Sequence, residues 1–283
     1  LAASAHAPDP RGAQGCKPVG GVSFQIVSPF WSPREQRLYW ADRLAPAVHA
    51  MESGGQPRLI ARFSHPIETL SAAPEGGLDV ICEDGWYWLP AEGQAPRLMR
   101  PTYSRVAAMR SGPDGARWAA CVLSQKTDIG VFGAGFEFHP IWSAPGAVDD
   151  LVVSPDGTQV YAADGARGVI YEFRKGRVAP HVLARIPRGA GEPRGLALDP
   201  EGRLWVALSD GWSVARLDAF GEIERVIVLP VRRPSGLTFG GPDRSQLYIA
   251  TARLGLPRDI LENAPLSGRL LVLAPDRQGG ATG

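Results

Sequence analysis

Short apolar runs separated by turn residues recur along the chain, and one segment shows the pattern clearly. Residues 148–164 read VDDLVVSPDGTQVYAAD, in which the runs LVV and VYA flank the turn Pro155–Gly157. Proline presets φ for a turn, Asp and Gly tolerate the positions that follow, and β-branched residues suit strands. The segment therefore predicts a β-hairpin, with the carboxylates of Asp149 and Asp150 just ahead of its first strand.

The same hairpin pattern occurs six times, at intervals of 41, 39, 42, 45 and 42 residues. Each turn is followed by an apolar or aromatic run such as LYW, RWA or LWV. A period of about 40 residues with four short strands per copy is typical of a propeller blade. The sequence thus predicts an all-β protein, a six-bladed β-propeller. Its turn prolines are Pro33, Pro74, Pro113, Pro155, Pro200 and Pro242.

The last blade of such a ring is expected to be completed by the beginning of the chain, because closure removes exposed sheet edges. We expect the last strand, Leu270–Leu273, to pair with the run Val22–Ile26. A single propeller domain then covers residues 21–275. A loosely ordered lead-in over residues 1–20 precedes it, and a flexible tail over residues 276–283 follows it.

Composition limits the partners more than it defines the activity. Thirty Lys and Arg nearly balance 29 Asp and Glu, so neither nucleic acid nor an acidic membrane is expected as a partner. No run of 18 or more apolar residues occurs, which argues against a transmembrane helix. Cys82 and Cys121 lie in apolar runs without CxxC spacing, which predicts reduced, buried thiols. We expect a cytoplasmic protein, monomeric or weakly dimeric, with a small-molecule metabolite as its partner; a processed, exported form is the alternative.

The innermost strand of each blade starts at one mouth of the central channel, where propellers carry their sites on loops and strand ends. The equivalent position lies six residues before each turn proline, and an extra glycine shifts it in the sixth copy. We refer to these six residues as the mouth positions. They are Val27, Glu68, Ala107, Asp149, Arg194 and Ser235.

Four segments together resemble the family of regucalcin (senescence marker protein), gluconolactonases and luciferin-regenerating enzymes. They read PFWSPREQRLYWAD at 29–42, RGLALDPEGRLWVA at 194–207, FGGPD at 239–243 and APLSGRL at 264–270. The resemblance spans roughly residues 22–273. It implies a six-bladed propeller that acts on a lactone or a related ester. It also implies one divalent cation in the channel, held by a Glu, two Asn and an Asp.

The family's metal ligands are largely replaced in this chain. The Glu position falls on Val27 and one Asn position on Ala107, although the arginine of that Arg-x-Asn motif remains as Arg105. The other Asn becomes Asp149 and the Asp becomes Arg194. A hard cation needs about six oxygen ligands, so we expect no metal and no other cofactor. A shifted cation site at Asp149 and Glu68 is the alternative. Because buried charges need partners, we expect Arg194 to pair with Asp149 or Glu68.

The resemblance and the changed ring together suggest an enzyme acting on a lactone, an ester or a related polar metabolite without a metal. Asp149 would then be the general base or orient water, and Arg194 and Arg105 would stabilise an anion. Three alternatives stay open: a non-catalytic propeller that binds a small anion, an enzyme that has drifted to isomerisation or cyclisation, and a protein-interaction platform. For the two arginines, the competing role is an internal ion-pair network.

Five further residues are candidates for contact with the substrate. Glu68 and Ser235 occupy mouth positions, and Asp150 follows Asp149 directly. His139 precedes a proline and is expected in a loop. Gln125 begins the long segment 125–145 between the third and fourth copies, which we expect to form a lid over the channel.

Overall fold

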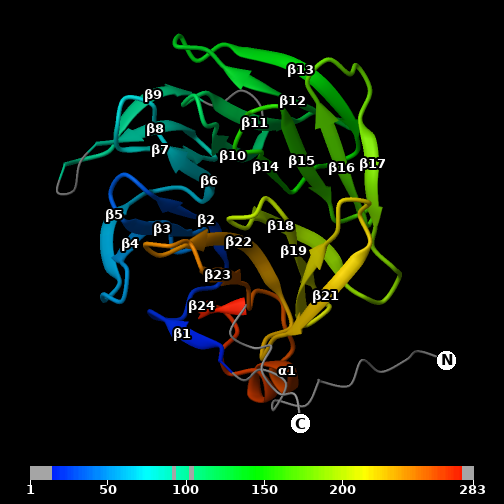
Figure 1. Ribbon diagram of the computed structural model, residues 1–283. Helices are drawn as coiled ribbons and strands as arrows, with labels where there is room; N and C mark the ends of the chain where they lie inside the picture. Colours follow the sequence, from blue (N-terminus) through cyan, green and yellow to red (C-terminus); the bar gives the residue numbers. More distant parts are fainter. Residues whose placement is uncertain (1–14, 91–93, 102–104, 276–283) are drawn as a thin grey trace.

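The computed structural model describes residues 15–90, 94–101 and 105–275. Its strands form six four-stranded antiparallel sheets arranged as blades around a central channel (Figure 1). The prediction of an all-β, six-bladed propeller is confirmed. Within residues 15–90, 94–101 and 105–275 there is one α-helix, α1 (Arg258–Asn263), and no helix long and apolar enough to cross a membrane.

Each blade runs from an inner to an outer strand in chain order, except that the outermost strand of the last blade comes from the start of the chain. Blade one consists of β2 (Ile26–Ser32), β3 (Arg37–Asp42), β4 (Ala47–Glu52) and β5 (Arg58–Arg62). Blade two consists of β6 (Ile67–Ala72), β7 (Leu78–Cys82), β8 (Gly85–Leu89) and β9 (Arg97–Pro101). Blade three consists of β10 (Arg105–Ser111), β11 (Arg117–Val122), β12 (Lys126–Phe132) and β13 (Phe138–Pro145). Blade four consists of β14 (Asp150–Val153), β15 (Gln159–Asp164), β16 (Val169–Arg174) and β17 (His181–Arg185). Blade five consists of β18 (Glu192–Leu198), β19 (Leu204–Ser209), β20 (Ser213–Leu217) and β21 (Ile223–Val228). Blade six consists of β22 (Pro234–Gly240), β23 (Gln246–Thr251), β24 (Leu270–Leu273) and β1 (Lys17–Val19).

Ring closure differs from the sequence-based expectation. Strand β24 pairs with β1, with Val19 opposite Leu270, and does not pair with the run Val22–Ile26. Ile26 instead begins β2, the inner strand of blade one. Residues 17–19, expected to be loosely ordered, are therefore the outer strand of blade six. The outer edge of β24 needs a partner for its backbone groups, and the chain segment just before blade one supplies it.

The turn that defines the repeat forms as its sequence predicts. In blade four the amide of Gly157 donates to the carbonyl of Ser154 at 2.9 Å, and Gly157 adopts a φ of +68°. The hydroxyls of Ser154 and Thr158, together with the Thr158 amide, donate to the Asp156 carboxylate. These hydrogen bonds, led by that of Ser154, lower the pKa of Asp156 to about 2.

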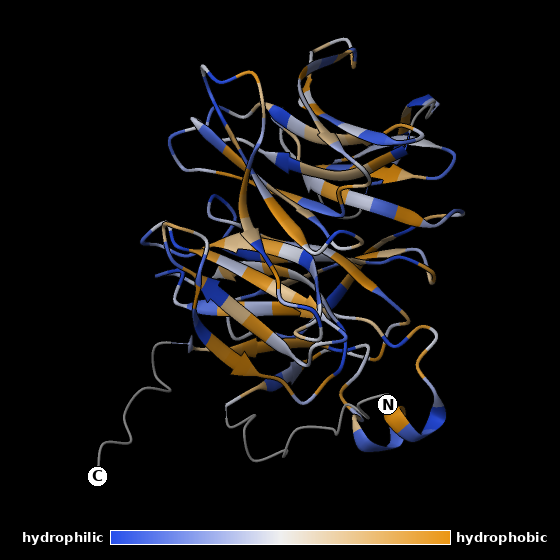
Figure 2. Cartoon of the chain, turned by 90° about the vertical axis from the view of Figure 1, so that its right-hand side faces the viewer, coloured by the Kyte–Doolittle hydropathy of each residue, from blue (hydrophilic) through white to orange (hydrophobic). Residues whose placement is uncertain are grey.

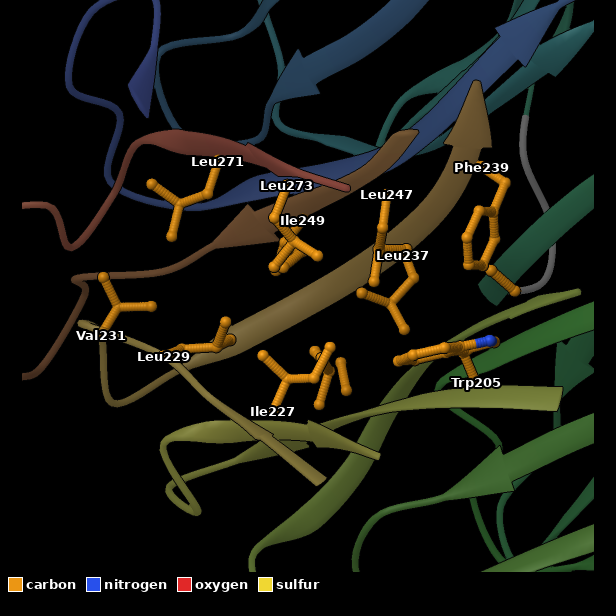
Figure 3. Close-up of a cluster of buried hydrophobic side chains, with 13 residues drawn as sticks. Trp205, Ile227, Leu229, Val231, Leu237, Phe239, Leu247, Ile249, Leu271 and Leu273 are labelled. Carbon is orange, nitrogen blue, oxygen red and sulfur yellow. The ribbon is translucent and has the colours of Figure 1, made fainter. Parts of the chain in front are cut away.

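The hydrophobic core lies between neighbouring blades, because each sheet carries apolar side chains on both faces. Figure 3 shows the cluster between blades five and six, where Trp205 packs edge-on against Phe239 with ring centroids 5.8 Å apart. Alternating hydrophobic and hydrophilic positions mark many of the strands (Figure 2). Cys82 and Cys121 are buried free thiols, as predicted. These contacts hold the six inner strands in fixed positions around the channel.

Segment 125–145 forms no lid. Most of it is the β12–β13 hairpin, the two outer strands of blade three. Lys126 lies opposite Pro145 and Phe132 opposite Phe138 in this ladder. The alternation of apolar residues in the segment reflects strand pairing at the rim of the propeller.

Candidate functional site

The mouth positions of all six blades line one cavity of about 510 Å³ at the end of the channel where the inner strands begin. We call it the mouth cavity. Ten of its lining residues are charged. They are Arg43, Glu68, Arg105, Arg110, Asp149, Asp150, Glu192, Arg194, Asp210 and Arg233.

Asp149 and Arg194 form an ion pair in this cavity, as the sequence suggested. Asp149 immediately precedes β14, where its amide donates to the carbonyl of Ala163 at 2.8 Å. The Nη1 atom of Arg194 lies 2.5 Å from Oδ1 of Asp149, and the Gly165 amide donates to Oδ2 at 2.8 Å. Arg194 also contacts Glu192, at 2.8 Å. Burial raises the pKa of Asp149, and the nearby Arg194 only partly offsets this.

The side chain of Asp150 is more deeply buried than that of Asp149, and its contacts are all with other parts of the protein. Its side chain contacts Arg110 at 2.6 Å and accepts hydrogen bonds from the amides of Leu151 and Leu196. Burial raises the pKa of Asp150, opposed by Arg110. Arg110 also lines a second cavity of about 780 Å³ at the opposite end of the channel, which we call the far cavity. The Arg110–Asp150 pair therefore lies between the two cavities, and the partners of Asp150 belong to the protein.

The remaining carboxylates of the mouth cavity are also paired with arginines. Glu68 lies 2.5 Å from Arg43, with both side chains largely buried. Asp210 lies 2.7 Å from Arg232 and 2.9 Å from Arg233. The cavity therefore carries a ring of arginine–carboxylate pairs contributed by several blades.

Two other predicted residues line the mouth cavity with different surroundings. Arg105 is exposed at the start of β10, and no ion pair to it occurs among the residues that the structure describes. Ser235 donates its hydroxyl to the carbonyl of Ile26 at 2.9 Å, so it links blade six to blade one. Ser235 thus has a bond that helps hold the ring closed.

His139 and Gln125 lie outside the mouth cavity. His139 is exposed on β13, the outermost strand of blade three, with its ring 3.3 Å from Glu137. Gln125 lies in the exposed turn between β11 and β12, where its carbonyl accepts the Gly146 amide. A proline neighbour marks irregular backbone, but it does not tell the inner edge of a blade from the outer edge.

The donor atoms at the four positions that the sequence resemblance assigned to metal ligands do not suit a hard divalent cation. Val27 and Ala107 offer hydrocarbon, and Arg194 places a positive charge there. Both oxygens of Asp149 already accept hydrogen bonds from the protein. The alternative of a shifted site meets a similar difficulty, since Glu68 is tied to Arg43. Across the described ranges, no three or more His, Cys, Asp and Glu side chains are grouped to hold a metal ion.

Sequence reasoning missed several charged residues of the cavity. Arg43 and Asp210 each come directly after the second strand of a blade, which ends at the same mouth where the first strand begins. Glu192 lies two residues before Arg194, and its carboxylate contacts that guanidinium although the β18–β19 ladder shifts register between Pro193 and Gly195. The end of the second strand thus identifies Arg43 and Asp210 once the strands are known, whereas strand period alone does not place Glu192.

Comparison with known proteins agrees with this architecture. Residues 27–253 match the family described as the SMP-30/Gluconolactonase/LRE-like region. The chain is 32% identical over 256 residues to 6-deoxy-6-sulfogluconolactonase of Pseudomonas putida, covering 85% of this chain and 87% of the relative. It is 25% identical over 263 residues to regucalcin of Xenopus laevis, with the same coverage.

The fold also matches solved structures. The calcium-binding protein regucalcin from Agrobacterium tumefaciens superposes with a TM-score of 0.80 at 19% identity, covering 92% of this chain and 93% of that one. The resemblance inferred from the four sequence segments is therefore confirmed over most of the propeller. The chain belongs to the SMP-30/gluconolactonase/LRE-like family.

Proposed function

We propose that this protein hydrolyses the lactone ring of a polar, sugar-acid-like metabolite in the mouth cavity. The observation that carries the proposal is the Asp149–Arg194 pair, a carboxylate of raised pKa held 2.5 Å from a guanidinium inside a polar cavity. Membership of the lactonase family and the name of the sulfogluconolactonase relative support the same reaction class. The volume of about 510 Å³ suits a small metabolite.

The proposed reaction uses the two side chains in complementary roles. A water molecule attacks the lactone carbonyl carbon and gives its proton to Asp149, whose raised pKa makes it a better base than an ordinary aspartate. The carbonyl oxygen becomes an oxyanion beside the Arg194 guanidinium. The ring C–O bond then breaks, and the leaving oxygen takes the proton back from Asp149. The product is an open-chain hydroxy acid.

We also propose that this chemistry needs no metal ion. The support is the donor set described above, in which a guanidinium occupies one of the family's ligand positions and Asp149 is its partner. Arg194 would supply the positive charge that a cation supplies in metal-dependent relatives. Glu192 helps to orient Arg194 through its contact with the second terminal nitrogen.

The test measures turnover of a panel of aldonolactones by the wild type and by matched variants. Turnover is monitored by the acid that hydrolysis releases and by mass spectrometry of the product. Asp149→Asn and Arg194→Ala should each lower kcat by about a hundredfold or more. Matched controls are Asp156→Asn in the exposed turn of blade four and Arg34→Ala in the far cavity, both outside the mouth cavity. Wild-type rates in Asp149→Asn and Arg194→Ala would contradict the mechanism.

A non-catalytic anion binder is the second candidate, favoured by one observation. Both oxygens of Asp149 are engaged in the structure, so the carboxylate has to give up one hydrogen bond before it can take a proton from water. Calorimetric binding of a hydroxy acid without turnover of any lactone would identify this function. Isomerisation or cyclisation would instead give a product of unchanged mass, whereas hydrolysis adds one water.

We further infer that the protein acts in the cytoplasm as a monomer or weak homodimer. Its three free cysteines, two of them in the core, suit a reducing compartment. Cell fractionation and light scattering test these two statements directly. Recovery outside the cytoplasm or a stable higher oligomer would contradict them.

A further inference from the structure

The far cavity has walls of a different character from those of the mouth cavity. Its volume is about 780 Å³, and five of the 28 described residues that line it are charged, against ten of 20 in the mouth cavity. Phe30, Trp31 and Phe239 line it on the side of blades one and six, and Val153 and Leu196 on the side of blades four and five. Concave sites with mainly apolar walls and a few polar groups are where small organic molecules bind. The far cavity therefore suits a ligand with an apolar body.

The two carboxylates that line the far cavity are engaged by the protein. Glu75 accepts two hydrogen bonds from Nη2 of Arg117, at 2.6 and 2.7 Å. Glu35 accepts the hydroxyl of Tyr39 at 2.8 Å. Neither carboxylate contacts an arginine that lines the cavity in the described part of the chain.

The arginines of the far cavity differ in how they are held. Arg110 pairs with Asp150 at 2.6 Å. Neither Arg34 nor Arg244 has a carboxylate partner within the described ranges. The guanidinium of Arg244 is steered onto the wall of blade five, where Nη2 donates one long hydrogen bond to the carbonyl of Leu198 at 3.4 Å. Its other N–H groups remain available to an acceptor in the cavity.

The backbone of Arg244 carries a conformational cost that its neighbours in the repeat avoid. Arg244 is the second residue after the turn proline, and it has a φ of +55°. Four other copies have glycine at this position, with φ between +68° and +93°; they are Gly76, Gly115, Gly157 and Gly202. The left-handed region is unfavourable for a residue with a Cβ and costs glycine nothing. Strained residues of this kind cluster at binding sites, where the side chain is needed. The exchange of glycine for arginine therefore trades stability for a guanidinium at the cavity wall.

We propose that the far cavity is a second binding site, which takes a small apolar molecule bearing one carboxylate, with Arg244 as the anchor of that carboxylate. The planar guanidinium matches a carboxylate through two parallel hydrogen bonds. The aromatic side chains of Phe30, Trp31 and Phe239 provide apolar surface for the body of the ligand. A single negative charge fits best, because Glu35 and Glu75 line the same cavity and repel a second one. This site lies at the opposite end of the channel from the Asp149–Arg194 pair and does not depend on lactone hydrolysis.

Calorimetry with three probes tests the two parts of the proposed ligand. 1-Naphthaleneacetate has the apolar body and the carboxylate, 1-naphthaleneacetamide has the same body without the charge, and acetate has the charge without the body. The wild-type protein should bind 1-naphthaleneacetate at least about tenfold more tightly than either of the other two. Absence of binding, or equal affinity for the acid and the amide, would overturn the inference.

Variants place the bound acid at one end of the channel. Arg244→Ala and Arg244→Gly should each weaken binding of 1-naphthaleneacetate about tenfold, and Arg244→Lys should restore part of the affinity. Arg34→Ala removes an exposed arginine of the same cavity that no described side chain or carbonyl holds in place, and as the matched control it should keep the affinity within about twofold. Arg194→Ala in the mouth cavity should also keep it. Weaker binding in Arg194→Ala with unchanged binding in the Arg244 variants would put the acid in the mouth cavity and overturn the inference.

Thermal unfolding without ligand separates a binding role of Arg244 from a structural one. Arg244→Gly removes the cost of the left-handed backbone and should raise Tm by about 2 °C while it weakens binding. Arg244→Ala keeps a Cβ at this φ and should leave Tm within about 1 °C of the wild type. A lower Tm in Arg244→Gly would show that the arginine supports the fold, and would overturn its assignment as a ligand anchor.

Discussion

Replacement of Arg194 by alanine should destabilise the protein in a way that depends on pH. The variant leaves Asp149 and Glu192 without their guanidinium partner. Truncating one member of a fully buried ion pair costs about 3–5 kcal/mol. Here the side chains of Arg194, Asp149 and Glu192 are 39%, 22% and 47% exposed, so solvent screens part of the loss. We expect about 2 kcal/mol near pH 8, or roughly 4–6 °C in Tm.

The pH dependence follows from Asp149. Burial raises its pKa above the ordinary value and Arg194 holds that rise in check, so the variant's Asp149 has a still higher pKa. A carboxyl with a raised folded-state pKa favours folding when protonated, and that contribution is lost as pH rises through the folded pKa. The stability deficit of Arg194→Ala should therefore be small below the wild-type pKa of Asp149. It should grow with pH up to the variant's pKa, by at most about 1.4 kcal/mol per pH unit.

Thermal unfolding followed by circular dichroism between about pH 4.5 and pH 8.5 measures this deficit. Arg34→Ala is the control and should show no comparable trend. Adding Asp149→Asn to Arg194→Ala removes the unpaired carboxylate and should recover stability at high pH, so the two substitutions should be strongly non-additive. A deficit that is equal at both ends of the pH range, or additive effects in the double variant, would refute this explanation of the pair.

Three further predictions concern the glycine beside the ion pair, metal binding and the buried cysteines. Gly165→Ala should lower lactone turnover by about tenfold or more, because an added Cβ would lie 2.9 Å from both Asp149 Oδ2 and Arg194 Nε. Gly21→Ala is the control, because a Cβ added there meets open space. Equal activity in both variants would argue against a fixed geometry of the Asp149–Arg194 pair. Millimolar Ca²⁺, Mn²⁺ or Zn²⁺ should shift Tm by less than about 1 °C. A site with a micromolar Kd would instead add about 4 kcal/mol to the free energy of unfolding at that metal concentration. A shift of several degrees would show that the mouth cavity binds metal. Cys82 and Cys121, whose pKa values burial raises to about 12, should react with a disulfide reagent at about pH 8 only after unfolding; rapid labelling of the native protein would contradict their burial.

The sequence predicted the ring of blades because every repeat carries the same local turn chemistry. Pro155–Gly157 and its copies fix hairpins through φ preferences and short-range hydrogen bonds, which act within a few residues. The mouth positions followed from counting back from each turn proline, and the count held although the ladders shift register at Glu68, Ala107, Arg194 and Ser235. The partner of β24 could not be obtained in this way. Lys17–Val19 is a strand of three mostly exposed residues without alternation, and only the unpaired edge of β24 specifies it.

The site was predictable to the extent that side chains lie on inner strands. Asp149 and Arg194 were paired on the argument that buried charges need partners, and the structure places them together. Which arginine meets which carboxylate depends on side-chain reach across blades, as for Arg43 with Glu68, and no local pattern encodes it. The prediction that His139 lies in a loop was wrong for a related reason, since a residue beside a proline can equally lie on the outermost strand of a blade.

Metal-independent hydrolysis at the Asp149–Arg194 pair is tested most directly by the initial rate of lactone hydrolysis by chelator-treated protein, measured for the wild type and for Asp149→Asn. The wild-type rate should be the same with chelator as with added Ca²⁺ or Mn²⁺, and Asp149→Asn should lower it about a hundredfold or more. A rate that appears only when metal is restored, or that is equal in Asp149→Asn, would contradict a metal-independent reaction at the Asp149–Arg194 pair.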